Sequence, residues 1–235
     1  MAAEFLLEIG SEEIPAGFLE PALESLAELF SRALTNARIG FGQIETFATP
    51  RRLVLSAATV DEGQPSQEIE KTGPPVASAF DEHGNPTKAA LGFAKSQGVD
   101  VADLIRVQTP RGEQLAVRKK EEGLPTPEVL ASLLPGMLER VAFPKTMRWM
   151  DLDVKFARPI HWIVALFGGS VVPFSIGNIQ SGNLSRGHRF ADASEFPVTS
   201  LQDLQNKLEE RGVVLDQARR RSTIEQRIQE LAKQE

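Results

Sequence analysis

The sequence predicts an α+β fold, with short, largely antiparallel strands, helices packed on them, and a C-terminal helical segment. Three observations support this class. Apolar runs of strand length occur at 4–10 and around 160–176, and amphipathic segments of helical spacing occur between them. Gly and Pro clusters separate these elements, and from Thr199 onward the pattern becomes helical up to the last residue.

The first elements are the clearest. "EFLLEIG" at 4–10 is typical of a short buried strand, and an amphipathic helix follows over roughly 17–37. We expect the adjacent carboxylates Glu12 and Glu13 at the start of this helix, where negative charge is favourable. "QIETFATPRRLVLSAATV" then predicts two strands separated by a break at Pro50.

The middle of the chain is rich in turn signals. Residues 63–88 indicate loops around short elements, and a helix is expected over 87–98. Residues 104–120 indicate a hairpin, and a further helix begins with Thr126 as its N-cap. Pro135 with the following glycine predicts a kink or a split in that helix.

In the second half, two β-branched runs flank Gly168 and Gly169, which form a two-residue turn of the kind that hairpins prefer. We expect one α+β body over 1–195 and a helical segment over 196–235. Because the last helical pattern reaches the terminus without a stop signal, we expect this segment to lead into further chain.

Composition excludes several classes. The 235 residues contain no cysteine, and no apolar run approaches the roughly 20 residues that span a bilayer. The N-terminus has an early Glu and no basic region, so it does not resemble a signal peptide. We therefore expect a cytoplasmic protein without membrane contact.

Charge is unevenly distributed along the chain. The formal net charge is −6, yet the 38 residues 154–191 contain no Asp or Glu. Burial explains the absence over 160–176, because core strands lack charge of both signs, but it does not explain 177–191, which is polar. A surface that faces nucleic-acid phosphates would need such a segment. Alternatively, its cations pair with carboxylates from elsewhere in the chain.

Four short motifs supply the candidate cations. In "SRGHRF", Gly187 would let the backbone approach a ligand closely, and arginines suit phosphate. In "PKTMRW", Trp149 could stack on an unpaired base. "RPIHW" and "TPRR" place further arginines beside predicted strands. The candidate contact residues are Arg51, Arg52, Lys145, Arg148, Arg158, Arg186, His188 and Arg189.

No catalytic constellation is evident. The sequence has no GxSxG elbow, no Walker loop and no GxGxxG fingerprint, and its three histidines lack metal-ligand spacing. We expect no catalytic residue and no metal site. The basic triplet "ARRRST" near the C-terminus, with acids close by, indicates a solvated helix face.

Seven motifs stand in an order that resembles one family. They are "FLLEIGSEEIPAGFL" (5–19), "FATPRRLVL" (47–55), "KTGPP" (71–75), "PTKAALGFAKSQGV" (86–99), "FPKTMRW" (143–149), "FARPIHWIVALFGG" (156–169) and "SRGHRF" (185–190). Together they resemble the N-terminal part of the β subunit of bacterial heterotetrameric glycyl-tRNA synthetase. The resemblance runs from about residue 4 to the end.

The resemblance implies a function. It implies an aminoacyl-tRNA synthetase, an α2β2 ligase of protein biosynthesis that uses ATP and Mg to attach glycine to tRNA(Gly). In that family the α subunit holds the adenylate-forming core, so this chain is expected to bind no cofactor itself. Its implied partners are the α subunit and tRNA(Gly), and its implied role is tRNA recognition.

Two alternatives stay open. The chain could be a subunit-interface module that touches the α subunit and never RNA. By analogy with modules of the phenylalanyl-tRNA synthetase β subunit, it could also be an editing-type hydrolase, although the missing catalytic set argues against this.

Overall fold

The computed structural model describes residues 2–148 and 154–233 and divides into two compact units. Unit 1 comprises Met1–Gln64 and Leu124–Glu235, and unit 2 comprises Pro65–Gly123. Unit 2 is thus an insertion within the chain of unit 1, which the sequence patterns did not indicate. The expected boundary near residue 195 stays a prediction. The α+β class is confirmed in both units.

The sheet of unit 1 is built around β1 (Ala2–Ser11), the predicted N-terminal strand. It pairs antiparallel with β3 (Arg52–Asp61) on one side and β9 (Ile160–Phe167) on the other. The strand order is β11-β12-β9-β1-β3-β2, and only the β12–β9 pair is parallel. The remaining strands are β2 (Ile44–Thr49), β10 (Ser170–Val171), β11 (Ser175–Ile176) and β12 (Ile179–Gly182).

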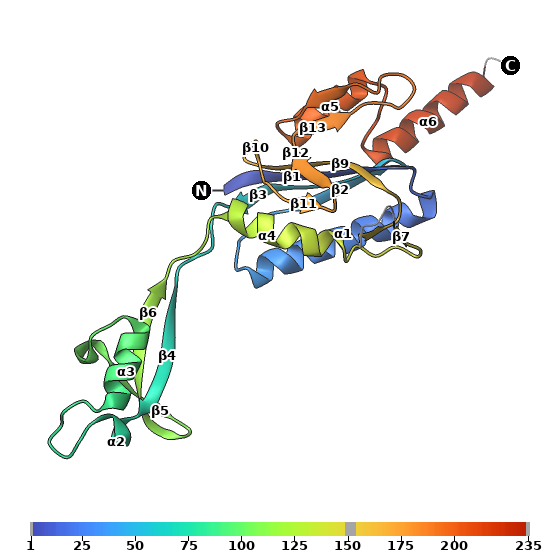
Figure 1. Ribbon diagram of the computed structural model, residues 1–235. Coiled ribbons are helices and arrows are strands. Elements are labelled where there is room, and N and C mark those ends of the chain that lie inside the picture. The colour runs from blue at the N-terminus through green and yellow to red at the C-terminus, as the bar shows by residue number, and fades with distance from the viewer. Residues whose placement is uncertain (1, 149–153, 234–235) are drawn as a thin grey trace. The chain divides into compact units, whose positions relative to one another are not determined.

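Helices cover both faces of this sheet (Figure 1). On one face, α1 (Ala16–Asn36) and α4 (Thr126–Leu138) bury the larger core, in which Phe5 stacks on Phe30. On the other face, α5 (Leu201–Glu210) packs Leu204 and Leu208 against Leu6. Alternate residues of β1 therefore enter different cores, as strand geometry requires.

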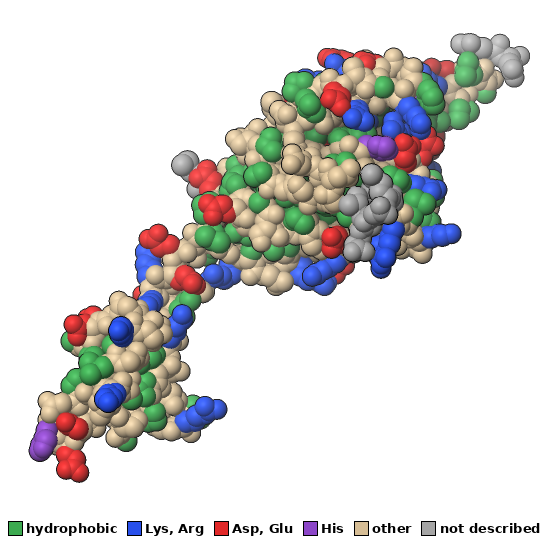
Figure 2. Space-filling view, viewed as in Figure 1, with side chains coloured by type: hydrophobic (Ala, Val, Ile, Leu, Met, Phe, Trp, Pro, Cys, Tyr) green, Lys and Arg blue, Asp and Glu red, His purple; other side chains and the backbone are tan. Residues whose placement is uncertain are grey.

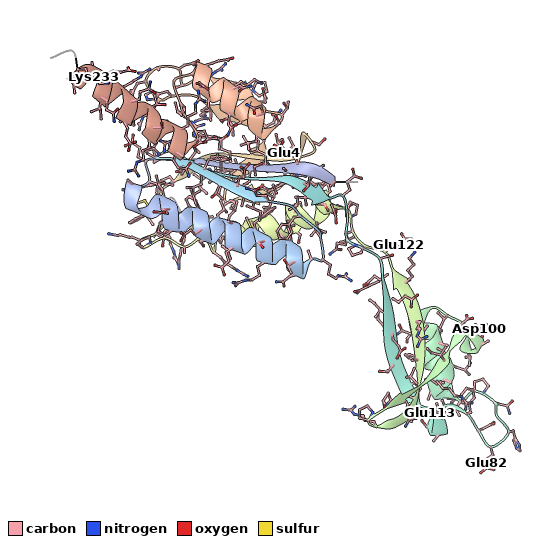
Figure 3. All side chains as sticks on the ribbon, turned by 180° about the vertical axis from the view of Figure 1, so that it is seen from behind. Glu4, Glu82, Asp100, Glu113, Glu122 and Lys233 are labelled. Carbon is pink, nitrogen blue, oxygen red and sulfur yellow. The ribbon has the colours of Figure 1, made fainter. Side chains whose placement is uncertain are left out.

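The chain returns repeatedly to the second face of the sheet. The short strands β13 (Leu184–Arg186) and β14 (Glu195–Pro197) pair with each other before α5 begins. The carboxylate of Glu4 in β1, labelled in Figure 3, accepts a hydrogen bond of 2.6 Å from the Leu201 backbone. The last helix, α6 (Gln217–Ala232), is anchored at its start, where the Gln217 side chain accepts a hydrogen bond from Ala48 in β2.

Unit 2 has a sheet of its own. Its strands β4 (Gln67–Pro75), β6 (Gly112–Glu121) and β5 (Ile105–Thr109) pair antiparallel in the order β4-β6-β5. Helices α2 (Val76–Ala79) and α3 (Lys88–Gln97) and the turn η1 (Val101–Asp103) complete it. The core is small and centres on Ala79, Ala90 and Leu115.

Most predicted elements are confirmed. The break at Pro50 separates β2 from β3, and α3 lies where a helix over 87–98 was expected, ending at the left-handed Gly98. Gly168 and Gly169, with φ of 56° and 79°, form the turn between β9 and β10. Both conformations suit glycine, as a type I′ turn requires.

Several predictions are wrong. Residues 63–88 contain the nine-residue strand β4. The loop interpretation missed this strand because its residues are mostly polar and it is formed by pairing with β6. Helix α4 is not split at Pro135, although a kink there stays a prediction, and its N-cap is Pro125 rather than Thr126. No acidic residue lies in the first turn of α1, so Glu12 and Glu13 serve elsewhere.

Candidate nucleic-acid interface

A buried ion pair underlies the candidate surface. Glu8 of β1 is 0% exposed and Arg52 of β3 is 2% exposed, and their Oε1 and Nη1 atoms lie 2.8 Å apart. Burial lowers the pKa of Arg52 from its ordinary value, and the Glu8 carboxylate opposes that shift. An unpaired charge at this depth would be costly, so each partner requires the other.

Arg52 also fixes the loop that carries "SRGHRF". Its Nη2 donates to the carbonyl of Arg186 at 2.8 Å, and Nη1 lies 3.4 Å from the Ser185 hydroxyl. The guanidinium is therefore committed to the interior, because a phosphate could reach it only if this loop moved. Arg52 positions the candidate surface and does not belong to it.

Trp162 lies at the centre of a group of guanidinium side chains. The Cζ atoms of Arg51, Arg52 and Arg186 lie 6.0, 5.5 and 5.4 Å from the centroid of its ring. Trp162 is buried and the neighbouring His161 is exposed, because successive side chains of a strand point to opposite faces. Gly10 makes room for the indole, because a Cβ at that position would lie 1.9 Å from the Cε2 atom of Trp162.

Gly187 allows a close approach, as predicted, but the neighbour is the protein itself. A Cβ there would lie 2.1 Å from the carbonyl oxygen of Asp192 and 2.9 Å from the Cβ of Arg211. The glycine therefore lets the loop pack onto the segment after α5. Strand β13 ends at Arg186, so His188 and Arg189 lie in the loop that follows it.

Carboxylates from other segments pair with the cationic side chains of 154–191. Glu12 pairs with His161 at 2.9 Å and with Arg189 at 3.3 Å, and Glu13 lies 3.8 Å from Arg189. Figure 2 shows this mixture on unit 1, where acidic and basic side chains lie side by side around a histidine. Intramolecular pairing, the alternative left open above, thus accounts for part of the charge pattern.

The other candidate residues are dispersed. Arg186 forms a half-exposed pair with Glu195 at 2.8 Å, and the Nε of Arg158 donates to the backbone carbonyl of Glu13 at 3.0 Å. Lys145 and Arg148 are exposed. Trp149, proposed for base stacking, lies outside the described residues.

Three of the candidates, with Arg52, line a pocket of about 460 Å³ on unit 1. Arg51 enters it from the turn between β2 and β3, His188 and Arg189 from the loop after β13, and Arg220 from α6. Glu13 is the carboxylate among its lining residues. The full lining is Glu13, Thr49, Pro50, Arg51, Arg52, Gly187, His188, Arg189, Phe190, Gly212, Val213, Val214 and Arg220.

Two charges in this pocket lack a carboxylate partner among the described residues. Arg220 is held by backbone alone: Nη1 donates to the carbonyl of Val214 at 2.7 Å, and Nη2 to that of Ala48 at 3.1 Å. The Nε of Arg51 is buried without a hydrogen-bond partner. At the same pocket Phe190 is 85% exposed, an unusual position for a large aromatic side chain.

Sequence reasoning missed Arg220 and Phe190. Arg220 was assigned to a solvated face with its neighbours in "ARRRST", and Arg219 and Arg221 do pair with Glu209 and Glu225 on the exposed surface. Helical spacing placed the triplet around the helix but could not show which member faces the sheet. Phe190 was quoted only within its motif.

Within the described ranges, no group of three or more His, Cys, Asp or Glu side chains could hold a metal ion. No helix of the described residues is long and apolar enough to cross a membrane. The pocket lining includes four arginines, one histidine and one exposed aromatic ring.

Comparison with known proteins decides the family. The model of the family described as "Glycyl-tRNA synthetase beta subunit" matches residues 5–235. This chain belongs to the glycyl-tRNA synthetase beta subunit family. The resemblance carried by the seven motifs is confirmed, and it extends over both units.

Curated relatives agree with the family model. The glycine–tRNA ligase beta subunit of Syntrophotalea carbinolica is 53% identical over 231 residues, which cover 98% of this chain and 34% of the relative. The glycine–tRNA ligase beta subunit of Geobacter sulfurreducens is 51% identical over 233 residues, which cover 99% of this chain and 34% of that relative. The chain thus spans about a third of the length of the curated relatives it matches.

Proposed function

We propose that this chain is the N-terminal part of a glycine–tRNA ligase beta subunit and that it supplies a surface for tRNA(Gly). One observation carries the proposal: Arg51, Arg189 and Arg220, far apart in sequence, converge on one pocket of an acidic protein. Clustered guanidinium groups are suited to phosphate, both as charges and as paired donors. Lys145, Arg148, Arg158, Arg186 and His188 remain candidate contacts around it.

The half-exposed ion pairs do not prevent such a role. Pairs between exposed side chains are worth little, about 0–1 kcal/mol. A tRNA phosphate can therefore compete with Glu12 for Arg189, whose side chain is 46% exposed. Arg52 is left out of the proposed contacts because it is buried with Glu8.

In this proposal the chain acts within a cytoplasmic α2β2 ligase. The α subunit binds ATP and Mg and forms the adenylate, and the chain described here contributes no catalytic residue. The names of the relatives, which are beta subunits of a glycine–tRNA ligase, support the proposal that the chain works as one subunit of such an enzyme.

A second role, assembly with the α subunit, is favoured by a separate observation. Ile224, Ile228 and Leu231 of α6 are 54%, 60% and 65% exposed and lie at helical spacing on one side of the helix. An exposed apolar stripe of this kind suits a protein partner. We assign it to the α subunit.

The test compares the two roles directly. The chain is titrated with tRNA(Gly) at low and physiological salt, as wild type and as Arg51→Gln/Arg189→Gln, and is separately mixed with the purified α subunit. The proposal predicts salt-sensitive tRNA binding that the double substitution weakens. Binding to the α subunit without any binding to tRNA would instead make the chain an assembly module.

A further inference from the structure

The pocket on unit 1 that Arg51, Arg189 and Arg220 share differs from an extended basic surface. A duplex backbone is contacted by cations spread along its path, whereas these side chains line one cavity of about 460 Å³. Ligand pockets in proteins have volumes of about 300–1,000 Å³. The cavity is therefore of a size that receives one unit of a chain, and its lining indicates what that unit carries.

The positive charge of the lining exceeds what the protein itself neutralises. Of its four arginines, one pairs with the buried Glu8, and a second lies 3.3 and 3.8 Å from the carboxylates of Glu12 and Glu13. The other two, Arg51 and Arg220, have no carboxylate within ion-pair distance among the described residues. Each phosphodiester of a nucleic acid carries one negative charge. Two guanidinium groups therefore match the two phosphodiesters that flank a single nucleotide.

The two remaining guanidinium groups have defined positions before any ligand binds. Arg220 donates to the carbonyl of Val214 at 2.7 Å and to that of Ala48 at 3.1 Å. The Cζ of Arg51 lies 6.0 Å from the centroid of the Trp162 ring. Because little side-chain freedom remains to be lost on binding, such groups are suited to hold a phosphate.

The exposed ring of Phe190 supplies a second kind of contact. Phe190 is 85% exposed although it lines the pocket, and the Cζ of Arg189 lies 5.8 Å from its ring centroid. An exposed aromatic ring beside arginines is a stacking surface for a nucleobase, and such stacking accepts any base. A base inside a helix already stacks on its neighbours, so only an unpaired base is free to use this ring.

We propose that this pocket holds one unpaired nucleotide within an RNA chain, with its base on Phe190 and the phosphodiesters on either side of it at Arg51 and Arg220. The inference rests on the proposed function, under which the RNA is tRNA(Gly). Single-stranded loops and ends are the parts of a folded RNA that present unpaired bases. The phosphodiesters belong to the chain itself, so the pocket requires neither a terminal phosphate nor a particular base.

The probes are tRNA(Gly), a short single-stranded RNA, that RNA annealed to its complement, and the same ribose-phosphate backbone without bases. The backbone without bases has the charge of the single-stranded RNA but cannot stack. Phe190→Ala removes the ring, and Phe190→Tyr keeps an aromatic surface. Leu124→Ala is the matched control, because Leu124 is 53% exposed at a different pocket, lined by α1 and α4. Circular dichroism verifies that each variant is folded.

The inference predicts that single-stranded RNA binds about tenfold more tightly than the backbone without bases. Phe190→Ala should abolish this difference and lower the affinity for tRNA(Gly) about tenfold, because one base loses its stacking surface. It should leave the affinity for the annealed RNA unchanged, since paired bases do not use the ring. Phe190→Tyr and Leu124→Ala should stay within about twofold of wild type.

Salt dependence separates the phosphate contacts from the stacking. Arg51→Gln should lower the slope of log affinity for single-stranded RNA against log salt by about 0.7, the value for one phosphate contact on a single strand. Phe190→Ala should leave this slope unchanged, because the ring carries no charge. An unchanged slope in Arg51→Gln would remove Arg51 from the proposed site.

The inference and the proposed function fail in different assays. If tRNA(Gly) binds but Phe190→Ala behaves like wild type towards tRNA(Gly) and single-stranded RNA, the nucleotide assignment is overturned and the proposed function stands. If no tRNA(Gly) binds while single-stranded RNA binds in a Phe190-dependent way, the proposed function is overturned and the pocket remains a site for another RNA. If the backbone without bases binds as tightly as the RNA, the site recognises charge alone, and the inference fails whether or not tRNA(Gly) binds.

Discussion

At the scale of single residues, Arg51 and Arg52 are neighbours with opposite environments. Arg52 is buried against Glu8, whereas Arg51 is partly exposed at a pocket. Adjacent side chains at the start of a strand point in opposite directions, so strand alternation accounts for this difference. Alternation alone could not show that Glu8, in a strand that is mostly apolar, would pair with Arg52.

Breaking the buried pair tests its structural role. Arg52→Met should destabilise unit 1 by about 3–5 kcal/mol, because Glu8 would remain as a buried unpaired charge. The double variant Glu8→Leu/Arg52→Met should cost less, since no charge remains. Urea unfolding followed by tryptophan fluorescence measures both, and equal losses in the two variants would contradict this account.

Gly10 provides a steric test. Gly10→Ala should destabilise by about 1–3 kcal/mol, because its Cβ would lie 1.9 Å from the Trp162 ring in the present packing. Gly17→Ala is the matched control: nothing lies within 4 Å of its added Cβ, and it lies in α1. The control should stabilise by about 0.5–1 kcal/mol. Thermal unfolding of the two variants should therefore shift in opposite directions.

At the scale of elements, the local sequence was enough to locate a helix, strand or turn where its residue types favour one kind of structure. Turn glycines, strand runs and helical spacing located β1, α1, α3 and the β9–β10 turn. They did not locate β4, which has mostly exposed residues and depends on its partner β6. Nor could they show which arginine of "ARRRST" would face β2, because that depends on tertiary packing.

Helix α5 allows a pH-dependent test. Burial opposes the shift, but hydrogen bonds from Lys207 and Thr199 outweigh it and hold the pKa of Asp203 below its ordinary value. A depressed carboxyl pKa stabilises the fold above the unfolded value of about 3.9, and this contribution is lost as pH falls through the folded value. Asp203→Asn should therefore lower the Tm at neutral pH.

The size of that effect is modest, corresponding to about 0.5–1 kcal/mol for a charge in the first helical turn. In thermal scans, the Tm difference between wild type and Asp203→Asn should shrink as pH falls from neutral to below the unfolded pKa of about 3.9. A difference that persists undiminished in acid would mean that the charge of Asp203 is not responsible.

At the scale of the whole molecule, the inserted unit 2 was the largest feature that the sequence did not reveal. Its ends meet within unit 1: the backbone N–H of Gln64 donates to the carbonyl of Leu124 at 3.0 Å, and Gly63 forms a bridge with Pro125. An insertion with adjacent ends leaves no compositional trace, because the surrounding elements simply resume after it.

Removing the insertion tests whether unit 1 folds by itself. Replacing residues 65–123 by a short Gly/Ser linker should leave unit 1 cooperatively folded, because the ends are already held together and loop closure costs little. Near-UV circular dichroism and a thermal transition are the measurements. A loss of the cooperative transition would show that unit 1 depends on unit 2.

The site was less predictable than the fold. The acid-free segment 154–191 was noticed from sequence, but the structure shows Glu12, Glu13 and Glu195 pairing with its cations. The pairs of Glu12 and Glu13 join residues that are more than a hundred positions apart, and the Arg186–Glu195 pair depends on the pairing of β13 with β14, so only the fold could reveal them. The pocket depends on Arg220 and Phe190, neither of which carries a distinctive local pattern.

The most direct test of the central claim is the slope of log affinity for tRNA(Gly) against log salt. Arg51→Gln/Arg189→Gln is compared with Arg32→Gln/Arg221→Gln, which removes the same charge from two exposed helix pairs. The account predicts a slope lower by about 1.4–1.8 for the pocket variant, the value for two lost phosphate contacts, and an unchanged slope for the control. Equal slopes for wild type and both variants would contradict a tRNA phosphate at this pocket.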